Sequence, residues 1–244
     1  MKLDHLTWLE VEAYLKRSRG IILPVGSTEQ HGPMGLIGTD SLCAEAIAER
    51  AAERADALVA PVLGYTPAPF NMGFPGTVSV SEATFRALFL EILEGLASHS
   101  FTRLFVLNAH GANLAPMRQA VESFCGAEVM IRSWWDFEEV NALRRKFYGD
   151  WEGMHATPAE ISITQALYRS LPAGDAAAPP RKLAPAEIEA RTGDNHGPAD
   201  EHKAEFPDGR VGSHSALADP DHGHELLKTA AEAVEREYLK FANS

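Results

Sequence analysis

Short apolar runs alternate with longer amphipathic segments along most of the chain. The apolar runs are continuous and end in turn or polar residues, which predicts four buried β-strands at residues 20–26, 57–63, 102–107 and 127–132. Apolar positions at helical spacing predict helices at residues 7–17, 41–55, 81–98, 114–124, 158–168 and 220–241. Apolar strands that alternate with helices are typical of a parallel sheet covered on both faces. We therefore expect an α/β fold, a three-layer α/β/α sandwich with a mostly parallel central sheet.

Residues 171–219 depart from this alternation. An Ala- and Pro-rich stretch is followed there by polar residues with several Gly and His. No internal repeat is present, and we expect a single α/β domain over residues 1–244, with 171–219 as an irregular surface excursion or an oligomer contact. Five late histidines have no recognisable metal spacing and are interpreted as surface residues, with the first two as candidates for reaching a neighbouring subunit's site: His196, His202, His214, His222 and His224.

The composition narrows the class of protein. Of 244 residues, 45% are hydrophobic, which supports a substantial core, and the net charge of -12 disfavours a nucleic-acid partner. No apolar run approaches the roughly 18 residues of a membrane span, and the first residues do not form a signal peptide. Cys43 and Cys125 form no CxxC pair, so neither a disulfide framework nor a thiolate zinc site is indicated. We expect a cytoplasmic protein without nucleic-acid or membrane partners.

The first candidate chemistry follows the first predicted strand. In an extended segment Glu29 and His31 stand two residues apart and point to one side, and Asp40 ends the loop where the next helix begins. Glu, His and Asp are ligands suited to zinc, manganese or iron. Each residue also has a plainer interpretation, because Asp40 can cap the following helix and a single His beside Gly is more often structural.

Two further groups lie at the third strand's exit and at a later helix start. His110 follows that strand between small residues, where parallel α/β folds bind ligands, although a satisfied loop His is the commoner case. Near His155, the residues Thr157, Pro158 and Glu160 form a capping-box pattern, which local sequence favours over a ligand role for Glu160. A capping Glu usually faces solvent, whereas a ligand would turn toward the strand ends. The joint placement of these groups, rather than any one of them, indicates a metal site.

Taken together, these motifs resemble the creatininase family of metal-dependent amidohydrolases. The match includes Glu-x-His-Gly-Pro with the later Asp40, Asn-x-His-Gly-x-Asn around His110, and a shortened His-Ala-Gly-Glu-x-Glu-Thr-Ser run at His155. Phe-Pro-Gly-Thr at 74–77 and Phe-Pro-Asp-Gly-Arg-x-Gly at 206–212 also match. The motifs keep the family's order over nearly the whole chain.

The resemblance implies a three-layer fold with a two-metal site at the strand ends, often assembled as a homo-oligomer, a hexamer. Carried onto this sequence, the ligands are a bridging Asp40, Glu29 with His110 on one side, and His31 with Glu160 on the other. The implied cofactors are two divalent ions per subunit, with zinc favoured and manganese or iron as alternatives.

The implied activity is hydrolysis of a non-peptide C–N amide bond, cyclic or formyl, in a small-molecule substrate. A water bridged by the two metals would attack the carbonyl, and His155 would be the catalytic proton shuttle, since an unperturbed His titrates near neutrality. Other branches of the family, acting on a peptide terminus in cofactor maturation or on a sugar-derived ring, are the alternative, as is a non-catalytic metal-binding scaffold. Because every ligand and the shuttle are present, the enzyme is favoured.

Three departures from the family pattern concern the substrate more than the metals. Ala112 stands where creatininase proper has a ligand Glu, and many relatives with Gly there take the ligand from the later helix, which is why Glu160 is assigned. Asn71 replaces a common His, and Pro158 and Ile161 replace Glu and Thr of the later motif. These changes argue against creatinine itself as the substrate.

Two residues are expected to bind substrate. Asn71 occupies the altered position just described, and Trp135 follows the fourth predicted strand, where family members use aromatic side chains. Core packing for one of Trp134 and Trp135 and rim exposure for the other is the plainer alternative.

Overall fold

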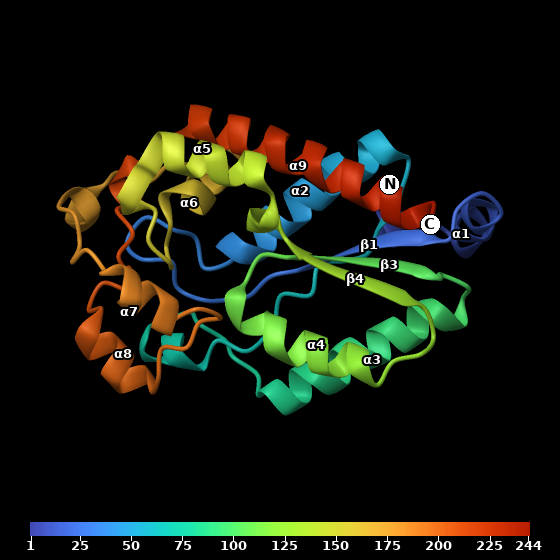
Figure 1. The fold of residues 1–244 in the computed structure, drawn as a ribbon, viewed down its shortest axis with the longest axis horizontal. Coiled ribbons are helices and arrows are strands. Elements are labelled where there is room, and N and C mark those ends of the chain that lie inside the picture. The colour runs from blue at the N-terminus through green and yellow to red at the C-terminus, as the bar shows by residue number, and fades with distance from the viewer.

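A four-stranded, all-parallel sheet forms the centre of the computed structural model, which describes residues 1–244 (Figure 1). The strands are β1 (Gly20–Val25), β2 (Leu58–Val59), β3 (Arg103–Asn108) and β4 (Glu128–Ser133), in the spatial order β2-β1-β3-β4. Ile22 of β1 pairs with Phe105 of β3, which pairs with Met130 of β4. The predicted α/β architecture is confirmed.

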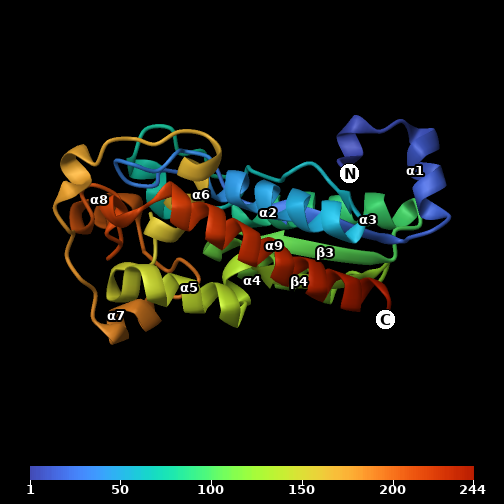
Figure 2. The ribbon, with the colours of Figure 1, turned by 90° about the horizontal axis from the view of Figure 1, so that it is seen from above.

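Helices cover both faces of this sheet, as Figures 1 and 2 show. One face carries α2 (Thr39–Ala55), α5 (Glu138–Tyr148), α6 (Pro158–Leu167) and α9 (Pro220–Ala242). The other carries α1 (Trp8–Leu15), α3 (Glu82–Ser98) and α4 (Leu114–Glu122). The short helices α7 (Pro185–Ala190) and α8 (Ala199–Glu205) lie beyond the end of the sheet.

Alternation along the strands divides the core into two layers. Ile22 and Phe105 pack with α2 and α9, whereas the adjacent Ile21 and Leu104 pack with Phe85 and its neighbours on α3. Successive residues of a strand point to opposite faces, so apolar residues at every position require a helix layer on each side.

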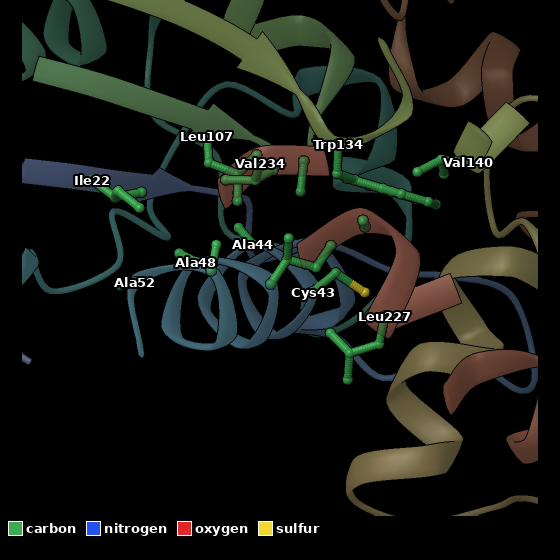
Figure 3. Packing of buried hydrophobic residues seen from close by; sticks show 14 of the residues in the cluster. Ile22, Cys43, Ala44, Ala48, Ala52, Leu107, Trp134, Val140, Leu227 and Val234 are labelled. Atoms are coloured by element: carbon green, nitrogen blue, oxygen red, sulfur yellow. The ribbon is translucent and has the colours of Figure 1, made fainter. Parts of the chain in front are cut away.

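Small side chains bring α2 close to α9. Ala44 and Ala48 share one face of α2, and Figure 3 shows them in the same cluster as Leu227 and Val234 of α9. Ala44 and Ala48 are one turn apart on that face, and their small side chains let α9 pack closely against α2. Ile22 of β1 belongs to the same apolar cluster.

The sheet and the first site helix differ from the predicted boundaries. The second predicted strand is reduced to Leu58–Val59 and a single bridge between Val25 and Leu63, because Pro61 has no N–H to donate to a ladder. The helix predicted from residue 41 begins at Thr39 with Gly38 as its cap, so the interpretation of Asp40 as the capping residue is wrong. The apolar pattern also does not predict the polar helices α5, α7 and α8.

The segment 171–219 is not only a surface excursion. Phe206, Arg210 and Val211 are buried, and Lys203 of α8 donates to the Gly73 carbonyl, which ties the segment to the loops beyond the sheet. His202 is 1% exposed and packs edge-on against Phe70 of the same chain, so its interpretation as a surface residue is wrong. The helices of the structure include none that is long and apolar enough to cross a bilayer.

The close contact of α9 with α6 generates a prediction about stability. A Cβ at Gly223 would lie 1.9 Å from the Ser162 carbonyl oxygen, so Gly223→Ala should lower the free energy of unfolding by about 1–3 kcal/mol. Gly95 lies in α3, where an added Cβ would meet no atom within 4 Å, and Gly95→Ala should raise stability by roughly 0.5–1 kcal/mol. Urea unfolding of both variants measures the difference, and equal effects would contradict the described helix packing.

Candidate metal centre

The six candidate residues for metal binding and proton transfer meet at the carboxyl ends of the strands. The loop after β1 carries Glu29 and His31, the first turn of α2 carries Asp40, and His110 follows β3. Glu160 lies in the first turn of α6, just after His155. All six are buried. The carboxyl ends of parallel strands lie at one edge of the sheet, and this brings together residues up to 131 positions apart (Glu29 to Glu160).

Asp40 is shared by two groups of three ligand-type side chains. One, the His110 triad, is Glu29, Asp40 and His110, and the other, the His31 triad, is His31, Asp40 and Glu160. In the His110 triad, Nδ1 of the histidine lies 3.1 Å from Glu29 Oε1 and 3.2 Å from Asp40 Oδ2. In the His31 triad, Nε2 lies 3.0 Å from Asp40 Oδ1 and 3.9 Å from Glu160 Oε1. Each oxygen of Asp40 therefore faces a different histidine.

Backbone carbonyls orient both histidines. His110 Nε2 lies 2.8 Å from the Pro67 oxygen, and His31 Nδ1 lies 3.1 Å from the Glu29 oxygen. A carbonyl can only accept, so each of these nitrogens carries the proton and donates it. The opposite nitrogen of each ring faces the carboxylates, and it could bind a metal ion once it has lost its proton, which is how a metal-ligating histidine is held.

Close backbone approaches hold the first turn of α2 against the end of β1. A Cβ at Gly26 would lie 2.3 Å from the Ser41 nitrogen, so only glycine fits between the strand and the helix. Ser27 Oγ then donates to Asp40 Oδ2 at 2.7 Å. The glycine thus brings the shared carboxylate to the edge of the sheet.

Glu160 combines the capping role and the site role that the sequence leaves as alternatives. The capping box with Thr157 is present, since the Thr157 N–H donates to Glu160 Oε1 at 2.5 Å and the Thr157 hydroxyl accepts from the Glu160 N–H. The same carboxylate is buried and faces His31, and burial raises its pKa to about 7. A capping Glu at a buried helix start can therefore also face the strand ends.

The charges of the site fit a bound cation. Burial opposes protonation of His31, but the nearby Asp40 and Glu160 carboxylates outweigh it and raise its pKa to about 10. Burial likewise disfavours an ionised Asp40, yet the two histidines hold its pKa well below the usual range. Glu29 Oε1 is buried and lies 3.1 Å from His110 Nδ1 and 3.7 Å from His155 Nδ1. Carboxylate oxygens and imidazole nitrogens are the donor set that zinc or manganese binds.

His155 lies beside the triads and is held by a carbonyl in the same way. Its Nε2 lies 2.7 Å from the backbone carbonyl oxygen of Gln30, so this nitrogen donates. Its Nδ1 faces Glu29 Oε1 at 3.7 Å. Burial lowers the pKa of His155 to about 4, instead of leaving it near neutrality, so the ring is neutral at pH 7 and Nδ1 can accept a proton. Sequence reasoning missed Gln30. Its side-chain amide donates to Asn71 Oδ1 and to the Gly209 carbonyl.

The two residues expected to bind substrate have different positions. Asn71 is fully buried and donates to Glu29 Oε2 at 2.8 Å, so its contact in this structure is with a candidate ligand. Trp135 is half-buried and lines a cavity of about 230 Å³ above the triads, and Trp134 is buried in the core beside it.

Two charged residues of this cavity were not singled out from the sequence. Arg144 comes from the unpredicted helix α5, and Asp194 from the segment interpreted as an excursion. Arg144 donates to Glu152 at 2.8 Å and lies over the Trp134 ring. No local motif marks either residue, because each reaches the cavity only through the packing of distant elements.

Comparisons with known proteins give a consistent picture. Residues 4–237 match the family model described as creatininase, creatinine amidohydrolase. A creatinine amidohydrolase of Pseudomonas putida is 34% identical over 185 residues, which is 68% of this chain and 71% of that protein. A 3-dehydro-scyllo-inosose hydrolase of Thermotoga maritima is 29% identical over 67% of this chain and 55% of its own length. A mycofactocin precursor peptide peptidase of Mycolicibacterium smegmatis is 38% identical over 41% of this chain and 43% of its own length.

Solved structures superimpose over nearly the whole chain. A crystal structure of creatinine amidohydrolase superimposes with a TM-score of 0.74 and 27% identity, covering 97% of both chains. Creatininase structures of a Zn-Zn type and with Mn superimpose with a TM-score of 0.73 at 28% identity. Together with the match of the family model to nearly the whole sequence, these likenesses show that the chain belongs to the creatininase family of metal-dependent hydrolases.

Proposed function

We propose that this protein is an amidohydrolase that cleaves a cyclic or formyl C–N amide bond of a small molecule at a two-metal centre. The observation that carries the proposal is the pair of triads that share Asp40 at the base of a cavity. In our assignment Asp40 bridges the ions, Glu29 and His110 bind one, and His31 and Glu160 bind the other. Zinc is the favoured metal, and manganese is the alternative.

Bound at the triads, two divalent ions would supply a water of lowered pKa and polarise the substrate carbonyl. The chain's own contribution is positioning and proton transfer. His155 Nδ1 faces the triads while Nε2 is tied to the Gln30 carbonyl, so Nδ1 is the atom that takes a proton and returns it to the departing nitrogen. Asn71 donates to Glu29 Oε2, so Oε1 would be the oxygen of Glu29 that binds an ion.

The cavity supports a small substrate. Its volume of about 230 Å³ is below the 300–1,000 Å³ typical of sites for drug-sized ligands. Trp135 forms one wall and offers a flat apolar surface on which a ring could stack. A peptide terminus, as in the peptidase relatives, is the second candidate, since only one residue of a peptide would have to enter.

Assays of the purified, metal-loaded protein discriminate these substrates. We expect hydrolysis of members of a panel of lactams, formamides and cyclic guanidines, loss of that activity with a chelator, and its return with Zn²⁺ or Mn²⁺. Activity confined to peptides would replace the small-molecule assignment with the second candidate, and chelator-resistant hydrolysis would contradict metal dependence.

The bridging role of Asp40 predicts a joint loss of metal and activity. Asp40→Asn preserves shape but removes the charge between the two histidines, so both ions should be lost and turnover should fall to background. Metal analysis of the dialysed variant measures the loss. Asp56→Asn, an exposed change at the other end of α2, should retain both ions. An Asp40→Asn protein that still binds two ions would refute the ligand assignment.

The position of His155 predicts that its loss lowers activity while both ions stay bound. His155→Ala should retain both ions and lose about 10²–10⁴-fold in kcat, because the proton acceptor is removed while the triads remain. Metal analysis and steady-state kinetics on the identified substrate test this together. Unchanged kcat would remove His155 from the mechanism, and loss of an ion would make it a ligand.

A further inference from the structure

Arg144 is the only Lys or Arg side chain that lines the cavity above the triads. It lies on α5, belongs to neither triad, and is 19% exposed. Its Nε donates to Glu152 Oε1 at 2.8 Å, and its Nη1 donates to Asn141 Oδ1 at 2.8 Å. Its Cζ lies 5.5 Å from the centroid of the Trp134 ring. Three contacts therefore fix the orientation of this cation.

The ion pair with Glu152 does not use the whole guanidinium. A guanidinium has five N–H groups, and a carboxylate frequently binds two of them in parallel. Glu152 accepts from Nε, and Nη2 has no hydrogen bond to any atom of the chain. Glu152 thus balances part of the charge of Arg144 but leaves N–H groups that could donate to a further acceptor.

Asn141 ties this cation to the aromatic wall of the cavity. Its Nδ2 donates to the Trp135 carbonyl at 2.7 Å, while its Oδ1 accepts from Arg144. Trp135 lines the same cavity. A flat ring stacked on Trp135 would therefore share this cavity with the unused N–H groups of Arg144. A guanidinium that is already held in place loses little side-chain entropy when it binds a carboxylate.

Asp194 is the only acid of the cavity wall outside the triads. Its Oδ2 accepts from the Ala112 N–H at 2.8 Å and lies 3.6 Å from His110 Nδ1, and its Oδ1 lies 3.5 Å from His196 Nε2. These groups compensate the charge of Asp194 within the chain, and two bound ions would neutralise the triad carboxylates. Of the charged side chains in the cavity, Arg144 then has donors available to a substrate.

We propose that Arg144 selects the substrate by binding a carboxylate, so that the substrate is a small cyclic amide that carries an acidic group. The ring stacks on Trp135, the amide faces the triads, and the carboxylate accepts from the guanidinium. Arg144 determines specificity and takes no part in proton transfer. This inference rests on the proposed hydrolase function and adds a substrate class to it.

Binding of matched ligands to the zinc-loaded protein tests this inference. Pyroglutamate and pyrrolidinone share a lactam ring and differ by one carboxylate, and dihydroorotate and dihydrouracil form a second such pair. In calorimetric titrations the acid of each pair should bind the wild-type protein more tightly. Arg144→Gln should weaken binding of the acids about 10–100-fold, as expected for the loss of a charge-assisted hydrogen bond, and leave binding of the uncharged rings unchanged. For a ligand that is hydrolysed, the same loss should raise KM at an unchanged kcat.

Arg145→Gln on the same helix is the matched control, because this side chain is 61% exposed and pairs with Glu138. It should leave the affinities for the acids unchanged. A preference for the acids that persists in Arg144→Gln would place their carboxylate on the ions and overturn the proposal. Equal binding of acids and uncharged rings, no binding of the acids, or a preference for cyclic guanidines would overturn it as well.

A second variant separates substrate recognition from a structural role. Arg144→Gln alone leaves Glu152 buried without its cation, whereas Arg144→Gln combined with Glu152→Gln removes both charges together. The double variant should keep the wild-type zinc affinities and still lose the preference for acids. An equal loss of affinity for acids and uncharged rings would indicate a structural role and overturn the proposal. A wild-type protein that binds fewer than two zinc ions would instead contradict the proposed function.

Discussion

Asp40 lies between two histidines, with one carboxylate oxygen facing each, and the other groups of the site are arranged around it. Buried carboxylates repel one another, and burial alone would protonate them. Without metal, the two facing histidines supply the compensating charge, which is why the pKa of His31 rises to about 10. With metal, the same ring nitrogens would be ligands, so the site can exchange protons for cations without moving its side chains.

The sheet makes this charge cluster possible because the carboxyl ends of its parallel strands lie at one edge. The strands β1 and β3 pair in register up to Val25 and Asn108, and Gly26 lets α2 approach β1 closely enough for Asp40 to reach the edge. The stacked helix layers on each face are large and apolar, and they support an edge that is polar and buried. Backbone carbonyls of Pro67 and Glu29 then orient the histidines.

Much of this arrangement could be predicted from the sequence, and the misses have physical causes. The strands and most helices follow from apolar runs, and the residues at strand exits indicate where ligands would gather. The ligand set of Glu29, His31, Asp40, His110 and Glu160 follows from the family resemblance, because local sequence alone favours capping for Glu160. The helix α5 was missed because its exposed face is charged, and β2 was overestimated because Pro61 cannot continue a ladder. The segment 171–219 has no periodicity, so nothing local indicated that it folds back over the cavity. Roles that come from residues far apart in sequence, such as those of Gln30 and Arg144, emerge only from packing.

The proposed centre requires that two ions share Asp40, one in each triad. Diffraction from crystals of the metal-loaded protein, recorded at the absorption edge of the bound metal, tests this directly. We expect two anomalous peaks per subunit, about 3.5–4 Å apart, on either side of the Asp40 carboxylate. A single peak, or peaks away from the Asp40 carboxylate, would contradict the shared-carboxylate assignment.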